Sequence, residues 1–279
     1  MGRTEGSLFQ ALLKHFRARR GLSQLDLSLV ANISARHLSF LETGRAGPSR
    51  EMVLRLGTAL GMSLREQNSF LKAAGFETEF AEPTLEAGLP PPIERALDRM
   101  LEQQEPYPLT VLGPCYDIVR ANGAAQRVLA RFVANPTALG APPNVLRMLF
   151  DPRLVRPFVV DWEHTAHGVL ARLHREALMK PGDQRLSTLL RSLLEYQDVP
   201  DYFREPDLSR PVEATLPFRL KRDGFECAFL TTMTFFSAPQ SVALEELMIE
   251  SYFPLDDATA ALCQQMAEES LQRWMQHEP

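Results

Sequence analysis

Six polar residues between positions 24 and 45 carry side chains that can read or hold a nucleic acid. A guanidinium can bind a guanine edge or a phosphate, and hydroxyl, amide and imidazole groups can hydrogen-bond to either. The six candidate DNA-binding residues are Gln24, Ser34, Arg36, His37, Ser39 and Arg45. They indicate recognition of double-stranded DNA, provided that a folded element presents them on one surface.

Two short helices joined by a tight turn are predicted to present these residues. Ser23 and Asp26 have the spacing of a capping box, and Asn32 tolerates the left-handed conformation of a turn. The second helix should begin at Ser34 and end at Gly44. This is a helix-turn-helix, whose second helix enters the DNA major groove. The residues expected to face inward from the first helix are Leu25, Leu29 and Val30.

The second helix has an apolar side and a polar side. At about 100° per residue, Ala35, Leu38 and Leu41 share the side that should pack on the first two helices. Arg36 points away from that side, where it could reach DNA. We interpret Glu42 as an ion-pair partner for an arginine of the helix that precedes the motif.

Charge is distributed unevenly along the chain. Residues 1–75 carry eleven basic and five acidic side chains, a net charge of +6, whereas the whole 279-residue chain carries −5. The remainder is therefore −11. A basic N-terminal region followed by an acidic one predicts that only the N-terminal region meets a polyanion.

Composition and spacing argue against several other classes of protein. No apolar run approaches the roughly 18 residues that a membrane span needs, and no secretory signal is expected at the N-terminus. Cys115, Cys227 and Cys263 lie far apart and match no metal-ligand spacing, which favours a reducing, cytoplasmic setting. No nucleophile elbow or glycine-rich phosphate loop is evident, so we expect neither an enzyme nor a bound cofactor.

The residue composition changes twice along the chain, which divides the chain into three regions. Ser49 and Ser63 are placed to cap a fourth and a fifth helix, which makes residues 1–76 a compact all-α domain. Residues 77–92 are acidic and end in three prolines, as is typical of a semi-rigid linker. Residues 93–279 form the third region.

The third region alternates between strand-like and helical patterns. Long helices are predicted over 162–179 and 257–277, and Asp223-Gly224 is a hairpin signal. The predicted arrangement is an α+β domain with an antiparallel sheet, which could hold a small-molecule cavity. The five predicted strands are 109–112, 116–120, 214–220, 225–236 and 247–253.

Several sequence strings resemble known families. SARHLSFLETGR-x-x-PS resembles the XRE-type helix-turn-helix of lambda-repressor-like regulators. YDIVRAN-x-AA, LRMLFDP, RPFVVDWEHTA, TTMTFF-x-x-PQ and IESYFP, in this order, resemble the MmyB-like regulators. The resemblance implies a transcription regulator whose PAS-like C-terminal domain binds a small apolar ligand, with a fatty acid the best candidate.

Apolar residues of the third region could line such a ligand cavity, although each could equally be ordinary core. Arg147 or Arg120 could meet the carboxylate of a fatty acid. The eight apolar or aromatic candidates are Phe132, Leu146, Phe150, Phe158, Trp162, Phe229, Met233 and Phe235.

Two alternatives stay open for the third region. It could be a protein-interaction or dimerisation module with a solid core and no ligand. It could also be a haem or metal sensor, since His164 and His167 are three residues apart on a predicted helix, although further ligands at a convincing spacing are missing. In every case we expect a homodimer, because paired DNA half-sites match a two-fold symmetric protein.

Overall fold

A computed structural model gives the fold of the chain. It describes residues 3–82, 88–180, 183–205, 217–237 and 239–277.

The chain forms two compact units. The N-terminal unit comprises Met1–Gly88 together with Phe236–Glu246, and the C-terminal unit comprises Leu89–Phe235 and Leu247–Pro279. The chain therefore returns once to the N-terminal unit before it ends.

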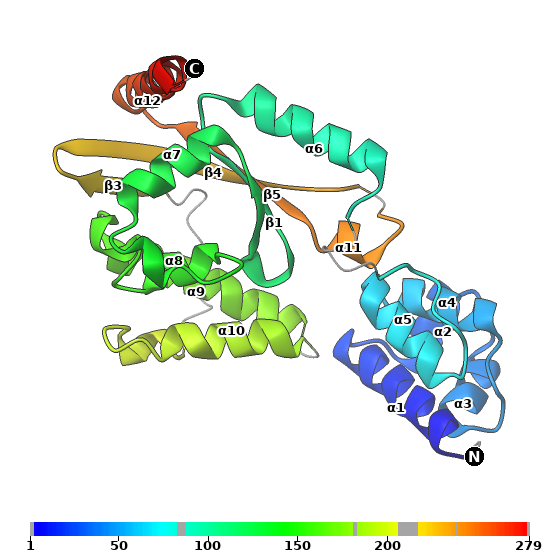
Figure 1. Ribbon diagram of the computed structural model, residues 1–279. Helices are drawn as coiled ribbons and strands as arrows, with labels where there is room; N and C mark the ends of the chain where they lie inside the picture. The colour runs from blue at the N-terminus through cyan, green and yellow to red at the C-terminus, as the bar shows by residue number, and fades with distance from the viewer. Residues whose placement is uncertain (1–2, 83–87, 181–182, 206–216, 238, 278–279) are drawn as a thin grey trace. The chain divides into compact units, whose positions relative to one another are not determined.

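In the described part of the N-terminal unit, every regular secondary-structure element is a helix (Figure 1). Its helices are α1 (Arg3–Arg19), α2 (Gln24–Val30), α3 (Ala35–Thr43), α4 (Arg50–Ala59), α5 (Leu64–Ala73) and α11 (Val242–Glu245).

Side-chain caps define the short helices of this unit. Ser23, Ser34, Ser49 and Ser63 each occupy the N-cap position and accept a hydrogen bond from a backbone N–H of the first turn. Gly44 ends α3 in the left-handed conformation, with φ of 74°. The predicted caps, the Ser23–Asp26 capping box and the turn at Asn32, with φ of 53°, are confirmed.

The core of the N-terminal unit corrects one prediction. Leu25, Leu29 and Val30 of α2 were expected to face inward, but their exposed fractions are 59%, 70% and 62%. Instead Leu27 and Ser28 are buried, because the inward stripe of α2 runs through positions 24, 27, 28 and 31. This stripe contains glutamine, serine and alanine, so it does not look apolar in the sequence.

A buried ion pair joins α1 to α3. Glu42 is 2% exposed, and its carboxylate accepts hydrogen bonds from Arg17 Nε at 2.6 Å and Arg17 Nη2 at 3.1 Å. Gln24 Nε2 donates a third hydrogen bond at 2.7 Å. Burial by itself would raise the pKa of Glu42, but the hydrogen bonds from Arg17 and Gln24 outweigh it and hold the pKa below its ordinary value. The structural role predicted for Glu42 is confirmed.

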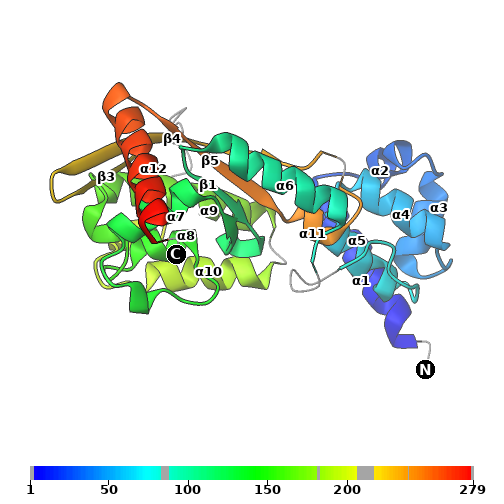
Figure 2. The ribbon, with the colours of Figure 1, turned by 45° about the horizontal axis from the view of Figure 1, so that its top comes forward.

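The C-terminal unit is an α+β domain built on one curved sheet (Figures 1 and 2). In Figure 1, α6 lies above the sheet, and α8, α9 and α10 lie below it. The strands are β1 (Leu109–Leu112), β2 (Ile118–Ala121), β3 (Phe218–Arg222), β4 (Phe225–Phe235) and β5 (Met248–Pro254). The helices are α6 (Pro91–Gln104), α7 (Gly123–Phe132), α8 (Val145–Phe150), α9 (Trp162–Met179), α10 (Gln184–Leu194) and α12 (Asp257–His277).

The sheet is antiparallel, with the strand order β2-β1-β5-β4-β3. The predicted fold class, an all-α helix-turn-helix domain followed by an α+β PAS-like domain, is confirmed. Asp223 and Gly224 form the predicted hairpin turn with positive φ angles. The predicted strand 214–220 lies partly outside the described residues, which resume at 217.

The segment that joins β4 to β5 packs in the N-terminal unit. The backbone N–H of Leu64, at the start of α5, donates to Glu245 Oε2 at 2.8 Å, and Arg65 Nε donates to Glu246 Oε1 at 2.7 Å. The backbone N–H of Val242 donates to the carbonyl of Ala81, and the Val242 side chain is fully buried. Residues 77–82 of the predicted linker and residues 236–246 of the predicted third region therefore both belong to the N-terminal unit.

Replacing Glu42 with alanine should destabilise the N-terminal unit. The change leaves Arg17 and Gln24 without their shared acceptor, and such a loss costs about 1–3 kcal/mol when one partner stays near the surface. Urea unfolding of the native protein and the variant measures the cost. Glu51→Ala is the matched control, because Glu51 is 79% exposed in its pair with Arg55. Equal losses in both variants would contradict a special role for the buried pair.

Candidate DNA-binding surface and ligand cavity

The outer side of α3 and the residues just beyond it present two exposed arginines. Leu38 and Leu41 are fully buried, so the opposite side of this short helix faces solvent. Arg36 is exposed there, and Arg45 is exposed just beyond the Gly44 cap. The Phe40 ring lies between them, 5.3 Å from the Arg36 guanidinium carbon and 5.9 Å from that of Arg45. Contact with the ring face restrains both guanidinium groups without neutralising them.

The other four candidate DNA contacts differ in their exposure and in the hydrogen bonds that their side chains already make. Ser34 Oγ accepts the capping bond from the His37 backbone N–H, which leaves its hydroxyl hydrogen available to a phosphate. His37 and Ser39 are half-buried on α3. Gln24 begins α2 and uses its amide N–H on Glu42, so its first role is structural. Contacts of all six residues with DNA remain a prediction.

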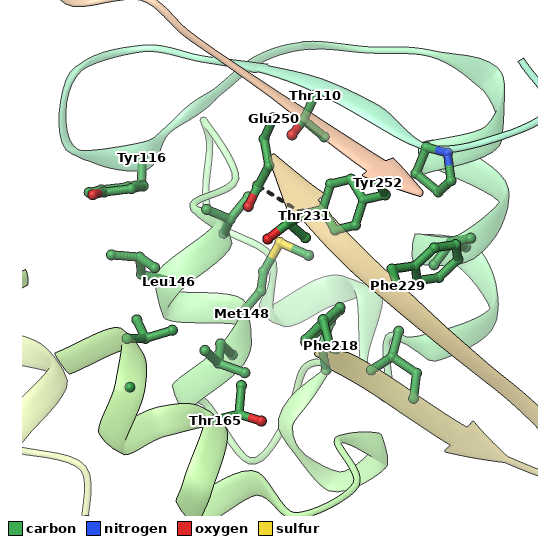
Figure 3. A pocket seen from close by; sticks show the side chains of 18 of the residues that line it. Thr110, Tyr116, Leu146, Met148, Thr165, Phe218, Phe229, Thr231, Glu250 and Tyr252 are labelled. Carbon is green, nitrogen blue, oxygen red and sulfur yellow. Dashed lines mark hydrogen bonds between the residues drawn. The ribbon is translucent and has the colours of Figure 1, made fainter. Parts of the chain in front are cut away.

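A cavity of about 770 Å³ lies inside the C-terminal unit, within the size range of small-molecule sites. One wall is the inner face of the sheet, with Phe218 and Leu220 of β3 and Phe229 of β4. The opposing walls come from α7, α8 and α9 (Figure 3). Most of the lining is apolar, which suits a ligand that is mainly hydrocarbon.

Three of the predicted ligand residues line this cavity, namely Phe132, Leu146 and Phe229. They come from α7, α8 and β4, three elements that the sheet brings together.

The remaining predicted ligand residues lie elsewhere. Phe150 and Trp162 stack edge to face at 5.7 Å, and Phe158 packs on Phe132 at 6.4 Å, all behind the cavity lining. Met233 packs against the core, and Phe235, near the end of the sheet, is 58% exposed.

Neither arginine suggested as a carboxylate partner lines the cavity. Arg147 borders a separate surface depression beside Asn144 and Arg185. Arg120 forms ion pairs with Glu94, at 3.2 Å, and Asp98 of α6. The arginines in the cavity wall are instead Arg172 and Arg175 of α9.

Sequence reasoning missed a polar group on the cavity side of the sheet. Thr110 of β1 pairs with Glu250 of β5, and Thr231 of β4 pairs with Tyr252 of β5. All four side chains line the cavity. The available signal was the alternation of β5, in which Ile249 and Ser251 are buried on one face, so Glu250 and Tyr252 must share the other.

Electrostatics mark Glu250 as unusual. Its surface faces the cavity rather than bulk water, and this desolvation raises the pKa of the carboxyl group above its ordinary value of 4.5. The hydrogen bond from Tyr252 Oη, 2.8 Å from Glu250 Oε2, and the charge of Arg172 oppose the rise without cancelling it. Desolvation likewise raises the pKa of Tyr252 well above 10.

Two of the three histidines of α9 also face this region. His164 and His167 line the cavity, and the His167 ring packs on Phe203 at 5.4 Å. Among the residues that the structure describes, no three His, Cys, Asp or Glu side chains gather closely enough to hold a metal ion. No helix in the described part of the chain has the length and apolar character to span a membrane.

Comparison with known families finds two matches along the chain. The family described as "MmyB-like transcription regulator ligand binding domain" matches residues 93–266. A "Helix-turn-helix domain" family matches residues 9–70. The first match takes in the cavity and the second takes in the α2–α3 motif. A comparison with curated proteins found no match.

Two solved structures show limited likeness to the chain. The clp gene regulator ClgR from Corynebacterium glutamicum is 27% identical, with a TM-score of 0.23, over 37% of this chain and 95% of that one. An RNA-binding light-oxygen-voltage receptor is 15% identical, with a TM-score of 0.27, over 98% of this chain and 66% of that one.

Glu250→Gln should remove a pH-dependent loss of stability. Because the pKa of Glu250 is raised in the folded state, that state holds the proton more tightly than the unfolded state. The free energy of unfolding of the native protein should therefore fall as pH rises from about 4.5 through the folded-state pKa, and glutamine cannot ionise.

Urea unfolding between about pH 4 and pH 8 tests this, since the native protein should lose stability relative to the variant as pH rises. Glu226→Gln, at a carboxyl that is 48% exposed beside Lys221, is the control. Parallel pH curves for the native protein and Glu250→Gln would contradict the prediction.

Proposed function

Because the chain belongs to the MmyB-like transcription regulators and joins their ligand-binding domain to a helix-turn-helix, we propose that a small apolar ligand, of the fatty-acid class, controls its binding to operator DNA. The observation that carries the proposal is the largely apolar cavity in the matched domain. The chain acts as a regulator and not as an enzyme, and it works in the cytoplasm, where the DNA is.

The N-terminal unit supports the DNA half of the proposal. The net charge of +6 on residues 1–75 favours a polyanion, and Arg36 of α3 and Arg45 just beyond it are exposed beside Phe40. In this proposal Arg36 reads a base edge and Arg45 binds a phosphate. Two copies of the chain would read half-sites about one helical turn apart, near 34 Å.

The cavity supports the ligand half. Its volume suits a lipid-sized molecule, and its walls include Phe132, Leu146 and Phe229. Arg172 and Arg175 line the same cavity, so a carboxylate at one end of the ligand would meet positive charge there. An apolar chain with an acidic head would pack against the apolar lining and place its carboxylate beside the two arginines.

The connection between β4 and β5 supplies a physical route for control. Both strands line the cavity, whereas the residues between them, 236–246, pack on α5 through Leu64 and Arg65. A ligand that shifts β4 or β5 pulls on a segment that is anchored in the DNA-binding unit. A ligand can change DNA affinity only through such a difference between two arrangements.

Arg36→Ala should weaken binding to the specific operator by about 1–3 kcal/mol and relax its sequence preference, because a base contact is lost. Fluorescence anisotropy with specific and unrelated duplexes measures both effects. Arg55→Ala is the matched control, since it removes one positive charge of the same unit at the Glu51 pair on α4. Equal effects of the two variants would mean that Arg36 acts only through charge.

Ligand control predicts that a bound fatty acid changes operator affinity, within the usual range of about 5- to 150-fold for coupled sites. Operator titrations with and without a long-chain fatty acid measure the change, and native mass spectrometry shows whether a lipid co-purifies. Equal operator affinity would reject ligand control and leave DNA binding standing.

The double variant Glu245→Ala/Glu246→Ala should keep both binding activities and lose the effect of one on the other. It removes the acceptor for the Leu64 N–H and the Glu246 carboxylate that pairs with Arg65, while the pair of Arg65 with Glu82 remains. Glu226→Ala, in the β3–β4 hairpin, is the control. A ligand effect of native size in the double variant would exclude this route.

A further inference from the structure

A compact polar cluster interrupts the apolar wall of the cavity. Figure 3 shows Thr110, Thr231, Glu250 and Tyr252 gathered on the sheet, whereas Leu146 lies across the cavity from them. The four polar residues come from three adjacent strands, β1, β4 and β5. A cavity built for a plain hydrocarbon chain has no need of them.

The register of the sheet holds the cluster in one place. Residues directly opposite each other on antiparallel strands share a face, so Thr110 lies beside Glu250 and Thr231 lies beside Tyr252. Glu250 Oε2 accepts a hydrogen bond from the Tyr252 hydroxyl at 2.8 Å. The other carboxyl oxygen of Glu250 remains for a further partner.

Thr110 supplies an independent sign of an incomplete site. The residue is 4% exposed and lines the cavity, and its Oγ1 makes no hydrogen bond with any residue that the structure describes. The Tyr252 hydroxyl lies nearby, but without the geometry of a hydrogen bond. A buried hydroxyl without a partner is uncommon, because it forfeits the hydrogen bonds that water would provide.

We propose that the ligand carries a second oxygen, a hydroxyl or keto group on its acyl chain, which binds to Thr110 and Glu250. This inference rests on the proposed binding of a fatty-acid-like molecule. A chain hydroxyl can accept a hydrogen bond from the Thr110 hydroxyl and donate one to the free oxygen of Glu250. A plain alkyl chain would instead cover both groups and leave them without partners.

The position of the second oxygen follows from the neighbours of the cluster. The carboxylate head of the ligand is attracted by Arg172 and Arg175 on α9, whereas the Glu250 carboxyl group offers it no positive charge. Arg172 lies near enough to attract the charge of Glu250. The cationic wall and the polar cluster are therefore neighbours, which places the second oxygen close to the head, as in a 3-hydroxy fatty acid.

Competition binding to the full-length chain tests the proposal. A 3-hydroxy fatty acid and the unsubstituted acid of the same chain length would each displace a bound fluorescent fatty acid. The hydroxy acid should bind about tenfold more tightly, the value of one added hydrogen bond in a buried site. If neither acid binds, the fatty-acid proposal falls as well. If both bind equally, or the plain acid binds more tightly, only the oxygenated ligand is overturned.

Thr110→Val tests the residue assignment with little change of shape. It should abolish the preference for the hydroxy acid and leave the affinity for the plain acid within about twofold, since only the hydroxyl is lost. Thr165→Val is the matched control, because Thr165 is also a buried cavity threonine but lies on α9, apart from the cluster in Figure 3. A tenfold preference that survives in Thr110→Val, or that vanishes equally in Thr165→Val, overturns the assignment.

Discussion

The pairing of β4 with β5 is the constraint on which both halves of the molecule depend. The ladder runs from the Phe229–Pro254 pair to the Phe235–Met248 pair. Its register turns Thr231, Glu250 and Tyr252 toward the cavity, and a slip by one residue would turn them all away. At its end the chain enters the N-terminal unit as residues 236–246 and then returns. One ladder thus shapes the cavity and holds the segment that packs on α5.

Each unit contains a buried carboxyl group, and the two groups differ in how completely they are hydrogen-bonded. Glu42 has all the partners it needs, because Arg17 and Gln24 surround it, and it fixes α1 and α2 against α3. Among the described residues, Glu250 has one hydrogen-bond partner, Tyr252, and it otherwise faces the cavity. A satisfied buried carboxylate serves stability, whereas an incompletely paired one is a place for a ligand to bind. The difference in pKa direction, lowered for Glu42 and raised for Glu250, reflects this difference in surroundings.

The helix-turn-helix also divides its residues between structure and recognition. Gln24 looks like a DNA contact in the sequence, yet its amide holds Glu42. The side chains of Arg36 and Arg45 instead contact the Phe40 ring on the outer side of α3. A rigid core beneath a restrained basic surface is suited to reading DNA, since less freedom is lost on binding.

The sequence by itself determined the features that depend on a few neighbouring residues. The serine caps and the turns at Asn32 and Asp223-Gly224 were predictable, because capping and turn chemistry act within about one helical turn. The inward stripe of α2 was not, since Ser28 is buried only because other helices cover it. Tertiary structure alone decided that Phe132 lines the cavity while Phe150 lies behind it, that Glu250 stands beside Thr110, and that residues 236–246 join the other unit. These outcomes depend on strand register and packing between segments far apart in the chain, which no local pattern of residues records.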